Sequence, residues 1–145
     1  NVKSSKIKSL IEKGKLIEAN KLLGYKYNIQ GNVVKGDKIG SSIGFPTANI
    51  SVDEDKQLIP ANGVYSVNLI VDNNIYNAIC NIGIRPTFNI SDDLRIEIHV
   101  LNVEPINLYE TNVIVEFNYK VRDEIKFDNI KELKEQIKND ILSLN

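Results

Sequence analysis

The sequence predicts a mainly β protein, an antiparallel barrel or sandwich with a helix at its C-terminal end and a short helical segment at its N-terminal end. Three observations support this prediction. Apolar and polar residues alternate in several short segments between residues 25 and 117, and a period of two is typical of half-buried strands. Gly, Pro and Asn residues separate these segments, and no helical pattern alternates with them.

The composition indicates one ordinary globular domain. The chain has 145 residues, of which 42% are hydrophobic and 26% charged. Its net charge of −1 argues against a broad surface for nucleic acid or for an anionic membrane. Cys80 and His99 are the only residues of their types, which excludes an internal disulfide and a zinc site built from several Cys or His residues. A lone cysteine fits a reducing compartment, so we expect a cytoplasmic protein. No apolar run approaches the length of a membrane span.

Two short helices are predicted within the first 24 residues. Ser4 or Ser5 can cap the first, Gly14 can end it, and Gly24 offers a second stop. The apolar positions at helical spacing are Ile7, Leu10, Ile11, Leu16, Ala19, Leu22 and Leu23. A pair of helices this small has to pack on something larger, so we expect residues 1–24 to form a connector.

Five alternating segments predict strands. The clearest runs from Gly63 to Val71 and places Tyr65, Val67, Leu69 and Val71 on one face. The sequence Asp-Asn-Asn at 72–74 is typical of a turn, so the segment that follows is expected to return as a hairpin partner. The predicted strands cover residues 25–30, 63–71, 75–82, 95–101 and 112–117.

The C-terminal residues predict an amphipathic helix. Asn129, with Glu132 three places on, resembles a capping box. The apolar stripe consists of Ile130, Leu133, Ile137, Ile141 and Leu144. We expect this stripe to dock on the barrel.

Residues 31–49 form an unusual glycine-rich segment, GNVVKGDKIGSSIGFPTAN, with glycines at 31, 36, 40 and 44. The segment matches neither a Walker A loop nor a dinucleotide fingerprint. Two interpretations stay open. The main-chain N–H groups can wrap around phosphates, or the segment is a long connection between strands that binds nothing, and the spacing alone favours the second.

Thr47 and Asn49 follow this segment's proline. Phe45 precedes Pro46 and is therefore biased to an extended conformation. If the extension continues, Thr47 and Asn49 project to the same side of a strand. A hydroxyl and an amide oxygen side by side suit Mg²⁺ that also binds nucleotide phosphates. The alternative is a pair that satisfies backbone groups at a strand entrance, and the residues alone favour it.

Glu97 is the third chemical candidate, because it alternates with apolar residues on a predicted strand. A carboxylate held on a rigid strand can accept a proton from a substrate hydroxyl during phosphoryl transfer. The residues alone favour a solvated outer face instead. His99 lies on the same side, but no Ser or Cys constellation accompanies it.

The segment 81–88, with Arg122 and Phe127, can offer an aromatic and cationic wall to a flat ring, or serve as ordinary turns and surface.

Taken together, these segments resemble the riboflavin kinase module, in particular the C-terminal half of the bacterial bifunctional riboflavin kinase/FMN adenylyltransferases. Six strings occur in order: GFPTAN at 44–49, IPANGVYSV at 59–67, NIGIRPTF at 81–88, IEIHVL at 96–101, NLYE at 107–110 and VRDEIKF at 121–127. The first 24 residues of the chain are similar to the end of the adenylyltransferase domain that precedes the kinase module in these bifunctional proteins. The resemblance therefore implies that residues 1–24 are a connector from that domain and that residues 25–145 are the kinase barrel.

The resemblance implies a six-stranded antiparallel Greek-key β-barrel with a C-terminal helix. It also implies transfer of the γ-phosphate of ATP to the ribityl 5′-hydroxyl of riboflavin, which yields FMN and ADP. Thr47 and Asn49 would bind Mg²⁺, and Glu97 would be the general base. The implied nucleotide-binding residues are Gly36, Lys38, Gly40, Gly44, Pro46 and Thr47, and the implied flavin-binding residues are Arg85, Arg122 and Phe127.

Two departures from the family pattern concern the loops. Ser41 stands where the family commonly has Arg, so a phosphate contact there is missing or supplied elsewhere. Glu110 stands where Gly is usual.

Two other functions stay open: a flavin-binding barrel that senses FMN or riboflavin without transferring phosphate, and a barrel for single-stranded nucleic acid. The second would need a basic, aromatic-lined groove, which the acidic pI of about 5.9 gives little support.

Overall fold

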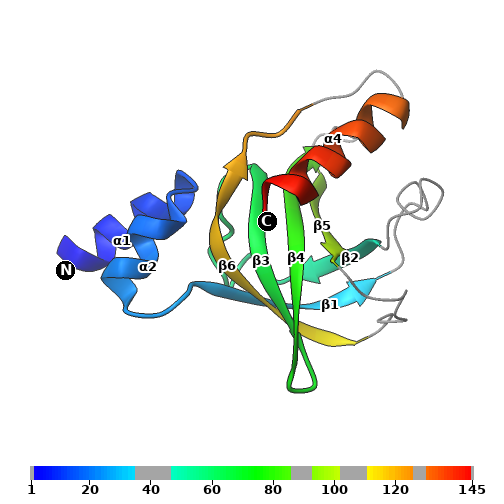
Figure 1. The fold of residues 1–145 in the computed structure, drawn as a ribbon. Coiled ribbons are helices and arrows are strands. Elements are labelled where there is room, and N and C mark those ends of the chain that lie inside the picture. Colours follow the sequence, from blue (N-terminus) through cyan, green and yellow to red (C-terminus); the bar gives the residue numbers. More distant parts are fainter. Residues whose placement is uncertain (1, 35–46, 86–92, 102–110, 126–129, 145) are drawn as a thin grey trace.

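The computed structural model describes residues 2–34, 47–85, 93–101, 111–125 and 130–144. Within these residues, six antiparallel strands close into a barrel with helices beside it (Figure 1). The strands are β1 (Asn28–Val34), β2 (Thr47–Val52), β3 (Gly63–Val71), β4 (Asn74–Arg85), β5 (Asp93–Val100) and β6 (Asn112–Arg122). The helices are α1 (Val2–Glu12), α2 (Leu16–Leu23) and α4 (Ile130–Ser143). The predicted barrel is thus confirmed.

The strand order around the barrel is β1-β2-β5-β4-β3-β6. Strands β3, β4 and β5 pair in sequence, and β6 returns to lie beside β3. This arrangement is the Greek key, in which a fourth strand comes back next to the first of three. Because β2 and β5 are distant in sequence but hydrogen-bonded, the topology brings residues 47–49 against residues 97–99.

The inward side chains of all six strands form one apolar core. Tyr65 and Phe117 meet edge to face inside it, with ring centroids 5.3 Å apart. The inward residues are Ile29, Val33, Ile50, Tyr65, Val67, Leu69, Val71, Ala78, Cys80, Ile82, Ile96, Ile98, Val113, Val115 and Phe117. The alternation that predicted strand 63–71 is confirmed, because its four odd-numbered apolar residues from Tyr65 to Val71 are all buried.

The hairpin between β3 and β4 turns where the sequence predicts it. Asp72 and Asn73 both have positive φ, 48° and 70°, and Val71 pairs with Asn74. A two-residue turn of this kind follows the twist of the strands that it joins, and Asn and Asp tolerate it. Strand β4 then runs to Arg85, three residues beyond the predicted end.

Two predicted strand boundaries at the β1–β6 seam are wrong. Strand β1 begins at Asn28, because the Asn20 side chain accepts a hydrogen bond from the Tyr27 N–H, and Tyr25 is 61% exposed. Strand β6 extends to Arg122 instead of ending at 117. A bulge opposite Ser66 and Val67 interrupts its two-residue period, so the pattern after 117 no longer alternates.

The glycine-rich segment is partly strand. Strand β1 continues through Gly31 to Val34, and β2 begins at Thr47. A Cβ on Gly31 would lie 2.5 Å from the Ser51 carbonyl oxygen, so β1 and β2 approach closely only because this residue is glycine.

Helices α1 and α2 pack against the barrel. Gly14 and Gly24 have φ values of 77° and 82° and follow the two helices, as predicted. Helix α1 begins at Val2, so Ser4 and Ser5 lie within the helix and the predicted cap is wrong. Ile11, Leu16 and Ala19 belong to the same apolar core as the barrel residues. Helices α1 and α2 thus contribute to the core of the fold, and the role of residues 1–24 as a connector to another domain stays a prediction.

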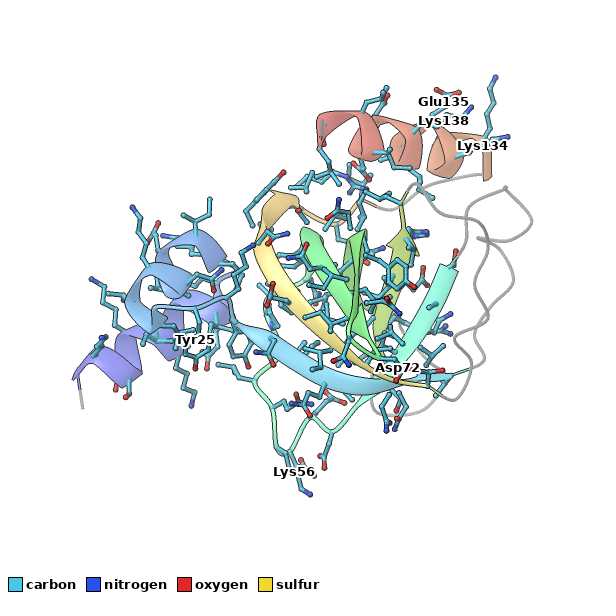
Figure 2. The ribbon with its side chains drawn as sticks, turned by 60° about the horizontal axis from the view of Figure 1, so that its bottom comes forward. Tyr25, Lys56, Asp72, Lys134, Glu135 and Lys138 are labelled. Atoms are coloured by element: carbon cyan, nitrogen blue, oxygen red, sulfur yellow. The ribbon has the colours of Figure 1, made fainter. Side chains whose placement is uncertain are left out.

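Helix α4 covers part of the barrel's outer surface (Figure 1). Val64 and Ile79 point outward from β3 and β4, yet they are only 2% and 3% exposed, and Ile137 of α4 is 6% exposed. Lys134, Glu135 and Lys138 lie on the side of α4 turned away from the barrel (Figure 2). Docking of the apolar stripe is therefore confirmed at Ile137. Asn129, the predicted cap, is outside the described residues.

Candidate active site

The pairing of β2 with β5 brings three candidate residues together. Asn49 lies directly opposite Glu97, and Thr47 lies opposite His99. Directly opposite residues in an antiparallel pair project to the same face. Ala48 and Ile98, the pair between them, belong to the inner side, so all four polar residues project outward from the barrel. The prediction that Thr47 and Asn49 share one side is confirmed, and Glu97 shares it with them.

Strand β4 adds an amide on the other side of Glu97. Asn81 lies directly opposite Glu97 in the β4–β5 register, and its neighbours Cys80 and Ile82 are inward and fully buried. Asn49, Glu97 and Asn81 therefore form one row across β2, β5 and β4, which we call the polar row. Sequence reasoning included Asn81 only as part of the segment 81–88, because nothing in the sequence pairs it with Glu97.

Two oxygens of the polar row are buried without a hydrogen-bond partner among the residues that the structure describes: Asn49 Oδ1 and Asn81 Oδ1. Asn49 as a whole is 9% exposed. A buried acceptor left unsatisfied costs about 1–3 kcal/mol, and in a native protein such a group calls for an explanation. A bound ligand that supplies a positive charge or a donor would remove this cost.

Mg²⁺ fits the β2 end of the polar row. The ion prefers hard oxygen ligands, and few of them come from the protein when phosphates supply the others. Asn49 Oδ1 is such an oxygen, and the Thr47 hydroxyl lies two residues away on the same face. The residues present are therefore suitable ligands for this ion.

His99 links Thr47 to helix α4. Its Nδ1 lies 3.4 Å from Thr47 Oγ1, and the side chain is 7% exposed. Burial lowers the pKa of His99 to about 4, and the negative charge of Asp140 only partly opposes this shift. His99 is therefore neutral at pH 7 and adds no positive charge beside Thr47.

Arg122 and Asp140 join the end of β6 to α4. The guanidinium Nε and Nη2 of Arg122 each donate to Asp140 at 2.8 Å, and Nη1 donates to the Asp123 carbonyl oxygen. Asp140 is 4% exposed and Arg122 is partly exposed, so the pair is bidentate with its carboxylate buried. Asp140 was not among the predicted site residues. The available signal was an acid placed between Ile137 and Ile141 on the apolar stripe.

The residues that follow β6 lie against β4. A Cβ on Gly83 would collide with the carboxylate of Glu124, so that carboxylate approaches the strand where a glycine leaves room for it. Gly83 is two residues from Asn81 and faces the same way. Glu124 thus borders the polar row on the β4 side.

Several predicted site residues lie outside the described residues. They are Gly36, Lys38, Gly40, Gly44, Pro46 and Phe127, together with the unusual Ser41. Arg85 is the last residue of β4, and its side chain is not described. Their roles stay predictions.

A separate groove of about 600 Å³ opens among the ends of β1, β2 and β6 and the β3–β4 turn. Asp72 marks that turn in Figure 2. None of the three candidate residues Thr47, Asn49 and Glu97 lines the groove. A large volume alone does not indicate a catalytic site. We therefore place the candidate site on the polar row.

Comparisons with known proteins identify relatives over almost the whole chain. The family model described as riboflavin kinase (flavokinase) matches residues 23–145. The bifunctional riboflavin kinase/FMN adenylyltransferase of Bacillus subtilis strain 168 is 39% identical over 141 residues, which are 96% of this chain and 44% of that protein. The chain thus spans less than half the length of this curated relative.

Two solved structures share the fold. The crystal structure of a macrolide-efflux protein from Streptococcus pneumoniae has a TM-score of 0.85 at 33% identity and covers 94% of this chain and 44% of that chain. The riboflavin kinase of Trypanosoma brucei has a TM-score of 0.53 at 24% identity and covers 79% of this chain and 74% of that chain. Among the described residues, no helix of the present chain is long and apolar enough to cross a bilayer.

Proposed function

The chain belongs to the riboflavin kinase family, and from this premise we propose that it transfers the γ-phosphate of ATP to the ribityl 5′-hydroxyl of riboflavin, giving FMN and ADP. One observation carries the proposal: Thr47, Asn49 and Glu97, which come from distant parts of the sequence, lie on one face of two hydrogen-bonded strands. A flavin-binding barrel without catalysis would need no such convergence.

Thr47 and Asn49 would hold Mg²⁺ together with the ATP phosphates. The unsatisfied Asn49 Oδ1 supports this role, because an amide oxygen buried without a donor is prepared to bind a cation. When bound, the ion neutralises the charge of the phosphates. Neutral His99 beside Thr47 supports the same assignment, because a second positive charge there would oppose the cation.

Glu97 would act as the general base. Its carboxylate takes the proton of the 5′-hydroxyl, the hydroxyl oxygen forms a bond to the γ-phosphorus, and the bond from that phosphorus to the β,γ-bridging oxygen breaks. The electron pair of the broken bond leaves with ADP. Because β5 is paired on both sides, by β2 and by β4, the strand holds Glu97 in a fixed position. Fixed positioning is the main contribution of a protein to phosphoryl transfer.

The remaining residues would hold the two substrates. The glycine-rich segment, with Gly36, Lys38, Gly40, Gly44 and Pro46, would lie over the phosphates, and Arg85, Arg122 and Phe127 would line the flavin. For Arg122, the bidentate pair with Asp140 supports a positioning role, in which it holds α4 and the residues after β6 beside the site.

The parent protein is proposed to carry a second activity. The Bacillus relative is named as bifunctional, and the chain covers 44% of it, which supports an FMN adenylyltransferase domain preceding residues 1–24.

The single buried Cys80 supports a reducing compartment, so we place the protein in the cytoplasm.

The test is direct. The purified chain is incubated with riboflavin, ATP and Mg²⁺, the flavins are separated by chromatography, and ADP is measured in the same samples. We expect FMN and ADP in equal amounts. The Glu97→Gln variant, purified in the same way, controls for a contaminating kinase. Riboflavin that stays bound but unphosphorylated would overturn the proposal and identify a non-catalytic flavin-binding barrel.

A further inference from the structure

Asn81 is the member of the polar row to which neither the family resemblance nor the proposed mechanism gives a role. It lies on β4, one strand from Glu97, while Asn49 lies one strand away on the opposite side. Neighbouring strands are about 4.8 Å apart, so the two amides are separated by about 10 Å. A single ion held at Asn49 is therefore too far away to be held by Asn81 as well. The two amides need different partners.

The chemistry of the Asn81 oxygen restricts what that partner is. Asn81 Oδ1 is buried and accepts no hydrogen bond from the described residues. On the same face, Ile79 offers no donor, the Glu124 carboxylate at Gly83 is itself an acceptor, and Arg95, which lies opposite Gly83 on β5, makes no hydrogen bond to Asn81 Oδ1. A ligand that brings a hydrogen-bond donor would satisfy Asn81 Oδ1, and a neutral hydroxyl is such a donor.

The acceptor substrate carries hydroxyls in a suitable arrangement. If the 5′-hydroxyl of riboflavin is at Glu97 and the phosphates are on the Asn49 side, the rest of the ribityl chain has to leave on the β4 side. The next hydroxyl, on the 4′ carbon, is one carbon away from the reacting one. We propose that Asn81 is a specificity-determining residue whose Oδ1 accepts a hydrogen bond from the ribityl 4′-hydroxyl while Glu97 binds the 5′-hydroxyl. This inference rests on the proposed kinase activity.

The experiment compares riboflavin with 4′-deoxyriboflavin as substrates. We expect the wild-type chain to use the deoxy substrate with kcat/KM lower by about tenfold, the factor expected for one hydrogen bond. Asn81→Leu and Asn81→Ala should use the two substrates within about twofold of each other, because both variants lack the acceptor. Asn81→Asp keeps an acceptor oxygen in the same place and should keep the discrimination, although its added charge lowers the overall rate.

The matched control is Asn77→Leu, an exposed outward-facing asparagine on the same strand and away from Glu97. It should discriminate as the wild-type chain does. The wild-type chain alone tests the inference, since equal use of the two substrates would overturn it whatever the variants do. Wild-type discrimination that persists in a folded Asn81→Ala variant would also overturn it, while leaving the kinase activity intact. Failure of the wild-type chain to phosphorylate riboflavin would instead overturn the proposed function.

Discussion

The two faces of strands β2, β5 and β4 differ in how completely their side chains are satisfied. On the inner face, Ile98 and Cys80 are fully buried among apolar neighbours, and burial raises the pKa of the Cys80 thiol, which keeps it protonated and inert. On the outer face, Asn49 and Asn81 present buried oxygens without a partner among the described residues. The inner face thus stabilises the barrel, while the outer face sacrifices some stability and is prepared to bind a ligand.

The largest effect is expected on the inner face. Ile98→Ala removes a fully buried side chain from the centre of β5 and should lower the free energy of unfolding by about 2–5 kcal/mol. Urea denaturation measures this loss. Because the Ile98 side chain points away from the polar row, kcat per folded molecule should change by less than about threefold. A variant that lost turnover while keeping its stability would contradict the division between the two faces.

Glu97→Gln tests the outer face of β5 at the residue next to Ile98. Turnover should fall by about 100-fold or more, in the range of general-base losses, while riboflavin binding and the free energy of unfolding stay as in the wild type. Steady-state kinetics and a fluorescence titration of riboflavin measure the two quantities. Near-normal turnover would mean that Glu97 is not the base.

The control for this variant is Glu116→Gln on β6. Glu116 also faces outward, but it accepts a hydrogen bond from Asn68 and lies away from the polar row. Its replacement should leave kcat within about twofold of the wild-type value.

The inner face could largely be predicted from the sequence, and the outer face could not. The alternation from Tyr65 to Val71 fixes which side chains point inward, because burial of apolar residues follows a local period. The polar row depends instead on the register between β2 and β5, whose residues are far apart in sequence. Thr47, Asn49 and Glu97 were found through motif resemblance. Asp140 was missed because the apolar stripe around it predicts only docking, and the bulge near Asn118 hid the end of β6.

The next largest effect is expected on the pH dependence of stability, because His99 is a buried titratable group on the outer face. Its pKa is lowered in the folded chain to about 4, against 6.5 in the unfolded chain. Between these two pH values the unfolded chain binds the proton more tightly, so stability falls as the pH falls and is unaffected by His99 above about 6.5. We expect a loss of about 2 kcal/mol between pH 6.5 and 5 from this group.

The lone histidine makes this prediction easy to measure. The imidazole NMR signal should titrate near pH 4 in the folded chain and near 6.5 in urea. The pH-dependent loss of stability should be smaller in His99→Asn, which keeps a polar group near Thr47 but does not titrate. A folded-state titration near 6.5 would show that His99 is not buried under α4.

Asn49→Ala should give the smallest effect. Removal of one proposed ligand should raise the Mg²⁺ concentration needed for half-maximal rate by about tenfold, with little change at saturating Mg²⁺. A metal titration of the rate measures this shift. Asn32→Ala, an exposed asparagine on β1, is the control and should titrate as the wild type does. An unchanged titration for Asn49→Ala would remove this residue from the metal site.

The most direct test of the whole account is a crystal structure of the chain with ADP, Mg²⁺ and riboflavin. The account predicts Mg²⁺ in contact with Thr47 Oγ1 and Asn49 Oδ1, and the riboflavin 5′-hydroxyl within hydrogen-bond distance of the Glu97 carboxylate. Magnesium and flavin bound away from the outer face of β2 and β5 would contradict it.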